Sequence, residues 1–168
     1  MIFKNNLNEK IFYVDIIFHL IIFLLISLNI IISHEILEIT VIVCLFIFLS
    51  KDSNIQWYFP LIIFLWGIYQ DLIIGSPIGY SGLIFLFFLL LNQLSNYFGI
   101  FTVSNIRFLI YFLGLCIFLV VEYIVILLHF DLNLSLIFLF SNLVIGSLIY
   151  FPIEIFIGNK INFNVSKK

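Results

Sequence analysis

Three carboxylates are the side chains of this sequence best suited to chemistry. Asp71 and Asp131 each stand at the end of an apolar run, and Glu122 lies well inside another run. Two carboxylates close enough to share a proton form the catalytic dyad of aspartic proteases. A pair made of Asp71 and Asp131 is therefore one hypothesis, although no supporting motif surrounds either residue.

Glu122 is the second candidate, because its neighbours on both sides are apolar over several helical turns. A charged side chain at the centre of a bilayer costs at least about 2.5 kcal/mol, so such residues are functional candidates by default. Burial disfavours the charged form of a carboxyl group. We expect Glu122 to be protonated or paired, with either a functional or a packing role.

Other polar side chains recur at helical spacing within the apolar runs. Serine and asparagine at such positions more often hydrogen-bond neighbouring helices than bind ligands. Four stripes result: Asp15, His19, Asn29 and Ser33; Ser81, Asn92, Ser95 and Asn96; Tyr111, Glu122 and His129; and Ser147, Tyr150 and Glu154. For Asp15 and Glu154 we favour a position at the membrane interface. The stripes predict a bundle with a partly polar interior or a polar face for a partner.

The elements that must position these residues are apolar runs of membrane-spanning length. Of the 168 residues, 64% are hydrophobic and 10% charged, which excludes an ordinary soluble domain. A helix needs roughly 20 apolar residues to cross the hydrocarbon layer, and helices satisfy their own backbone there. We expect an all-α integral membrane protein with one polytopic domain over residues 1–168. Its spans are expected near 11–32, 36–49, 57–74, 83–98, 108–130 and 134–157.

The basic residues predict the orientation of these spans. Cytoplasmic loops are enriched in lysine and arginine. With six spans, one side carries every basic residue of the chain: Lys4, Lys10, Lys51, Arg107, Lys160, Lys167 and Lys168. The opposite segments, 33–35, 75–79 and 131–133, carry none. Both termini are therefore expected in the cytoplasm, and a five-span alternative, which merges the first two runs, would break this partition.

The net charge and the cysteines argue against two further kinds of function. The net charge is −2 and there is no basic patch, so nucleic acid is not an expected partner. The two cysteines, Cys44 and Cys116, lie inside apolar runs. They are expected to act as small hydrophobic residues rather than as a disulfide or metal ligands.

The stretch 67–83 reads as a helix, a break and a second helix. Pro77 disfavours helical geometry at the preceding residue, and Gly75 and Gly79 permit a tight turn. Asp71 lies in the last turn of the first helix, from where it is expected to cap N–H groups at the start of the second. On this view asparagine should replace Asp71 well, because asparagine caps helices equally well.

This stretch resembles the signature of the bacterial rod shape-determining MreD family. That signature has a glycine ahead of an Asp-Leu pair, followed by glycine, an optional proline and Leu-Gly. The matching positions here are Gly67, Asp71, Leu72, Gly75, Pro77 and Gly79, with Ile78 in place of the usual leucine.

The resemblance implies a non-enzymatic scaffold of the cell-elongation machinery in the bacterial inner membrane. The implied partner is an MreC-like protein with a single span, linked to an MreB-type cytoskeleton and to peptidoglycan synthases. The implied fold is similar to the six-helix substrate-binding component of energy-coupling-factor vitamin transporters. The family brings no catalytic residues, cofactor or metal. The alternatives are a vitamin-type binding component of a transporter and, less favoured, the aspartyl peptidase.

Overall fold

The computed structural model describes residues 17–28, 39–50, 58–97, 104–130 and 136–162. The described residues form helices and turns, and they contain no strand. A helix over Ile17–Leu28 comes first. It is followed by α2 (Ile39–Leu49), α3 (Phe59–Ile74), α4 (Tyr80–Tyr97), α5 (Ser104–Phe130) and α6 (Leu136–Asn162).

The helices agree with the predicted runs in order and position, but not all have the length of a span. The helices α5 and α6 contain segments, Ile106–Val125 and Ile137–Ile155, that are long and apolar enough to cross a membrane. The Ile17–Leu28 helix, α2 and α3 are apolar but shorter. At 11 residues, α2 is about 17 Å long. Two spans are therefore supported by length and composition, and six spans stay a prediction.

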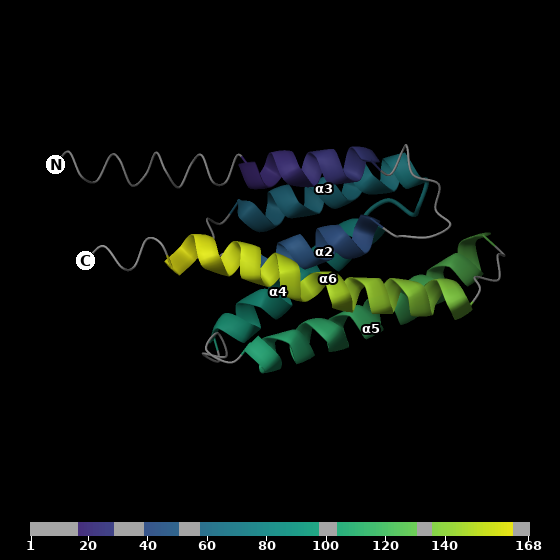
Figure 1. Ribbon diagram of the computed structural model, residues 1–168. Helices are drawn as coiled ribbons and strands as arrows, with labels where there is room; N and C mark the ends of the chain where they lie inside the picture. Colours follow the sequence, from purple (N-terminus) through teal and green to yellow (C-terminus); the bar gives the residue numbers. More distant parts are fainter. Residues whose placement is uncertain (1–16, 29–38, 51–57, 98–103, 131–135, 163–168) are drawn as a thin grey trace.

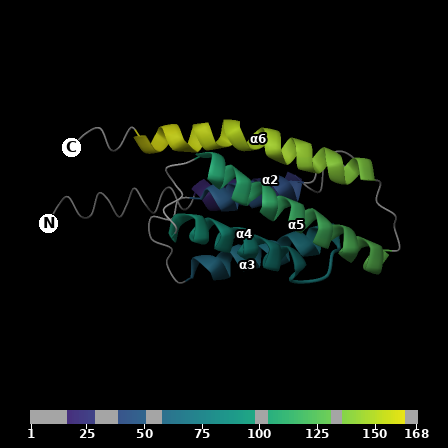
Figure 2. The same ribbon diagram turned by 90° about the horizontal axis from the view of Figure 1, so that it is seen from below.

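Successive helices run in alternating directions along one common axis (Figures 1 and 2). One end of the bundle holds the Leu49 end of α2, the Tyr97 end of α4 and the Ser104 end of α5. The turn between α3 and α4 lies at the other end. The short α2 lies in the middle, buried along nearly its whole length, and contacts α4, α5 and α6.

The closest pair of helices is α3 and α4, which make the most extensive contact between labelled helices in the described part of the chain. A Cβ atom added to Gly67 would lie 2.2 Å from both the Cα and the N atom of Gly82. Only glycine allows two backbones to approach this closely. Gly67 and Gly82 thus set the spacing of the helix pair that carries the turn.

The Ile17–Leu28 helix packs on α3 through aromatic side chains. The Trp66 indole N–H donates to Nδ1 of His19 at 3.2 Å. The Phe23 ring stacks on the Tyr69 ring with centroids 5.9 Å apart. His19, which the sequence placed on a polar stripe, therefore contacts α3. Its stripe partners Asp15, Asn29 and Ser33 lie outside the described residues.

Candidate functional site

The candidate site is the turn between α3 and α4, where the motif residues meet. Gly75 ends α3 in the left-handed conformation, with φ of 79°, and its N–H donates to the Asp71 carbonyl at 2.8 Å. Gly79 has φ of 92°, and its carbonyl accepts from the Leu83 N–H at 3.0 Å. Both glycines therefore occupy a backbone region that other residues rarely adopt. The predicted turn at Gly75 and Gly79 is confirmed.

The carboxylate of Asp71 holds this turn together. Its Oδ1 accepts from the Ser76 hydroxyl at 2.7 Å and from the Ser81 N–H at 3.0 Å. Its Oδ2 accepts from the Gly79 N–H at 2.7 Å. A negative group is also favoured at a helix N-terminus by the helix dipole. The predicted cap of the second helix by Asp71 is confirmed, and the side chain is only 1% exposed.

The geometry corrects one expectation about Asp71. Asparagine was expected to replace it well, because a single amide oxygen suffices for an ordinary helix cap. Here both carboxylate oxygens accept hydrogen bonds. An asparagine has one oxygen and two N–H donors, so its NH₂ group would face a donor of the turn. We therefore expect asparagine to be a poor substitute at this position.

The motif divides into a buried part and an exposed part. Gly67 and Asp71 are buried, and they shape the helix pair and its turn. Leu72 and Ile78 are 65% and 75% exposed, and Pro77 is partly exposed. The turn is thus a hydrogen-bonded frame that presents apolar side chains outward. That the motif binds a partner stays a prediction.

One side chain of the stripe on α4, that of Asn92, forms hydrogen bonds to other helices, as predicted. The Asn92 side-chain amide donates to the Ser50 carbonyl at 2.9 Å, which joins α4 to the end of α2. Ser81 donates its backbone N–H to Asp71, whereas Ser95 donates to the Asn92 carbonyl within α4. Asn92 and Ser81 therefore have packing roles at opposite ends of the helix.

The other stripes contribute buried residues to the bundle interior. Glu122 is 4% exposed and Tyr111 is fully buried, so both point inward from α5. On α6 the Tyr150 hydroxyl donates to Oε1 of Glu154 at 3.2 Å. Asn142 on α6, which belongs to none of the four predicted stripes, is also buried. A functional role for Glu122 stays a prediction.

Arg107 has a structural role that the sequence did not predict. From the sequence alone, Arg107 indicates only the orientation of the spans. Its Nη2 atom donates to the Phe48 carbonyl and to Oδ1 of Asn92, both at 3.4 Å, and it interacts electrostatically with Glu154. Arg107 thereby links the end of α2, α4, α5 and α6. The sequence feature that could have indicated this structural role is the position of Arg107, a lone arginine at the start of a long apolar run.

The remaining candidates are Asp131 and the two cysteines. Asp131 lies outside the described residues, so the proposed dyad is untested. Cys44 is buried in α2 and Cys116 is partly exposed on α5, and both are free thiols.

Comparison of the chain with protein-family models, with curated proteins and with solved structures gives no match.

Proposed function

We propose that the chain is a non-enzymatic, polytopic membrane scaffold of the MreD type, which binds an MreC-like partner through the turn between α3 and α4. The observation that carries the proposal is that this turn combines a hydrogen-bonded structure with exposed apolar side chains. Two backbone N–H groups and the Ser76 hydroxyl of the turn donate to Asp71, while Leu72 and Ile78 are exposed. A rigid apolar projection binds a partner with little loss of conformational entropy.

The outward faces of the helices support a membrane location. Large apolar side chains are exposed at helical spacing along α5, at Leu109, Leu113, Ile117, Val120 and Ile124. Only 33% of the apolar segment of α5 is buried, and 17% of that of α6. The core helix of a soluble protein would be mostly buried, whereas lipid accepts such faces. This argument favours helices that face lipid, with six spans as the proposed number.

The alternating helix directions support cytoplasmic termini. Arg107 lies at the end of the bundle where α6, which contains Lys160 near its end, also ends, and where the segment bearing Lys51 follows α2. The turn at Gly75 lies at the opposite end, whose connections carry no basic residue. Under the positive-inside rule the Arg107 end faces the cytoplasm. On this topology the proposed docking surface faces the periplasm, where the large part of an MreC-like protein would lie.

The test is copurification of the MreC-like partner, coexpressed with the chain in a rod-shaped bacterium. Leu72→Gln and Ile78→Asn should reduce the recovered partner at least tenfold and cause rounded cells, because they remove apolar contact area. Leu61→Gln is the matched control, since Leu61 is a similarly exposed leucine at the opposite end of α3 (59% exposed, against 65% for Leu72). Full partner recovery with Leu72→Gln and Ile78→Asn would reject the turn as the docking surface.

The two alternatives receive less support. A vitamin-binding site needs convergent polar groups in a pocket, yet the pocket between α5 and α6 is lined almost entirely by apolar side chains. A peptidase would need Asp71 to be available for proton transfer. Both of its oxygens instead accept hydrogen bonds from the turn, which favours a structural role.

A further inference from the structure

The helices α5 and α6 pack closely over the half of α6 that follows Gly146. The Tyr150 ring lies 5.1 Å from that of Phe108 and 5.2 Å from that of Tyr111, measured between centroids. A Cβ atom added to Gly146 would lie 3.0 Å from Cδ2 of Leu115, so the backbone of α6 lies directly against α5 at this point. Beyond Gly146, toward the start of α6, an open groove lies between the two helices.

This groove is concave, and the core of the bundle closes it from behind. Its volume is about 730 Å³, which is within the range of about 300–1,000 Å³ for ligand pockets. Leu119 forms the floor at 4% exposed, whereas Val120 and Phe140 form the rims at 59% and 67% exposed. Leu139 and Leu143 also line the groove and pack against the core. The groove therefore opens on the helix faces that were assigned above to lipid.

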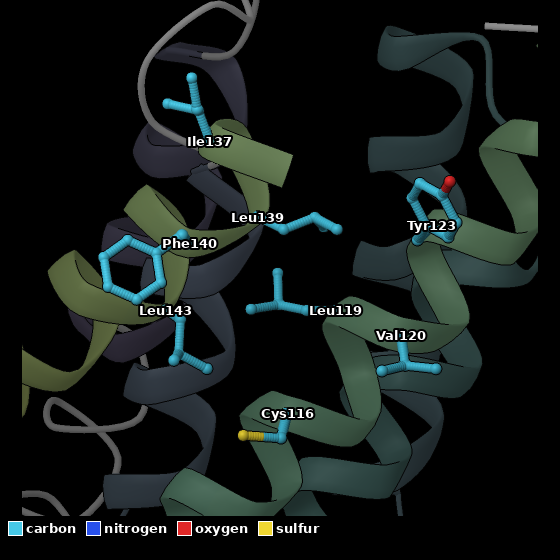
Figure 3. Close-up of a pocket in the computed structure, with 8 residues that line it drawn as sticks. All are labelled: Cys116, Leu119, Val120, Tyr123, Ile137, Leu139, Phe140 and Leu143. Atoms are coloured by element: carbon cyan, nitrogen blue, oxygen red, sulfur yellow. The ribbon is translucent and has the colours of Figure 1, made fainter. Parts of the chain in front are cut away.

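The polar group of the groove lies at one of its ends. Figure 3 shows Tyr123 and Ile137 at one end and Cys116 at the other, with the tyrosine oxygen pointing away from Cys116. No hydrogen bond joins the Tyr123 hydroxyl to another of the described residues. Tyr123 lies two residues from Val125, where the apolar segment of α5 ends, and Ile137 begins the apolar segment of α6. The hydroxyl is thus at the level of a membrane interface, and Cys116 lies about 10 Å deeper.

This distribution of polarity matches that of a phospholipid. A phospholipid has its ester groups near the interface and its acyl chains below them, parallel to helices that cross the membrane. A sugar-like or charged ligand would need several convergent polar groups, whereas this groove offers a single hydroxyl. A chain in the groove contacts two helices and the floor at once, so it gains more dispersion contacts than a chain against one convex helix.

We propose that the groove between α5 and α6 is a binding site for one phospholipid of the periplasmic leaflet. The first part of one acyl chain lies along Leu119 and reaches Cys116. The Tyr123 hydroxyl donates a hydrogen bond to an ester carbonyl of the same lipid. The inference rests on the membrane location and topology proposed above, and it does not depend on a partner at the turn between α3 and α4.

The site is tested by native mass spectrometry of the chain released from nanodiscs of phosphatidylethanolamine and phosphatidylglycerol. Gentle release should leave one phospholipid on each wild-type chain. Cys116→Trp fills the deep end of the groove and should lower the retained lipid at least tenfold. Ile117→Trp is the matched control, because it adds the same bulk at an exposed neighbouring position that does not line the groove. It should retain lipid as the wild type does.

A second pair of variants tests the polar end of the site. Tyr123→Phe keeps the ring but removes the hydroxyl, and it should lower lipid retention about two- to tenfold, the effect of losing one neutral hydrogen bond. Tyr97→Phe, which makes the same change at a tyrosine outside the groove, should have no effect. Circular dichroism of each variant checks that the helices are intact.

Three results would overturn the proposal: a wild-type chain without retained lipid, equal retention by Cys116→Trp and Ile117→Trp, or a lipid-free dimer whose groove is filled by a second copy. Recovery of the partner at the turn should be the same for Cys116→Trp and wild type. The lipid site and the docking surface can therefore fail independently of each other.

Discussion

Asp71 is the residue on which the proposed docking surface depends. Its two carboxylate oxygens receive a serine hydroxyl and two backbone N–H groups from the turn. All of these donors lie within ten residues of Asp71 in the sequence. Removing the acceptor leaves the buried Ser81 N–H and two partly buried donors without this partner, and a buried donor left unpaired costs about 1–3 kcal/mol. Substitution of Asp71 should therefore destabilise the turn more than substitution of any single donor residue.

We expect a graded loss of stability at this site. Ser76→Ala removes one hydroxyl donor and should cost about 1 kcal/mol. Asp71→Asn should cost about 1–3 kcal/mol, because its NH₂ group faces a donor, and Asp71→Leu should cost more. Thermal unfolding in detergent, followed by circular dichroism, measures the order. Wild-type stability of Asp71→Asn would mean that one amide oxygen is enough to hold the turn.

At the scale of elements, the pair α3 and α4 positions the turn. Gly67 lies where the two backbones cross, with no room for a methyl group beside Gly82. Gly114 on α5 is also crowded, but there the nearest atom is Cδ1 of Leu91, at 2.5 Å from an added Cβ. The end of a leucine side chain can rotate away, whereas a backbone atom moves only with its helix. Substitution by alanine at Gly67 and at Gly114 is therefore a matched comparison, and we expect the two substitutions to have different effects.

Gly67→Ala should separate α3 from α4 and sharply lower the yield of monodisperse protein. Overpacking costs typically 1–3 kcal/mol and occasionally more, and the 2.2 Å approach to backbone atoms places Gly67 at the upper end. Gly114→Ala should be mild, because alanine favours a helix by about 1 kcal/mol over glycine. Size-exclusion chromatography after identical purification measures both. Similar yields would mean that the α3 and α4 backbones tolerate greater separation.

At the scale of the whole molecule, the two ends of the bundle differ in character. One end carries Arg107 with its bonds to Phe48 and Asn92. The other carries the Asp71 turn. The helix α4 connects the two over 18 residues, which is about 27 Å and close to the thickness of the hydrocarbon core. The proposed topology thus places the two ends of α4 on opposite membrane surfaces.

Cysteine labelling at the two ends of α4 tests this topology. Ile78 lies just before α4 and Tyr97 is its last residue. They are 75% and 85% exposed, so Ile78→Cys and Tyr97→Cys should react readily. In a background lacking Cys44 and Cys116, an impermeant thiol reagent should label position 78 in cells with a permeabilised outer membrane. Position 97 should react only after the inner membrane is opened. The reverse pattern would place both termini outside, and equal labelling would reject a spanning α4.

The sequence by itself determined the local features of this protein. The order and approximate positions of the helices follow from apolar runs. The turn at Gly75 and Gly79 follows from glycine and proline geometry, and the Asp71 cap joins groups only a few residues apart. Such features depend on short-range sterics and hydrogen bonding, which are legible in a short stretch of sequence.

Only the tertiary structure decided which distant residues meet. The crossing of Gly67 and Gly82, the partners of Arg107, and the groove beyond Gly146 depend on the register and spacing of packed helices. These follow from side-chain packing summed over many contacts, which the apolar pattern of a single chain does not specify. The same reason explains why both oxygens of Asp71 are used. The sequence indicates a cap, and the packing of α4 against α3 brings the further donors to it.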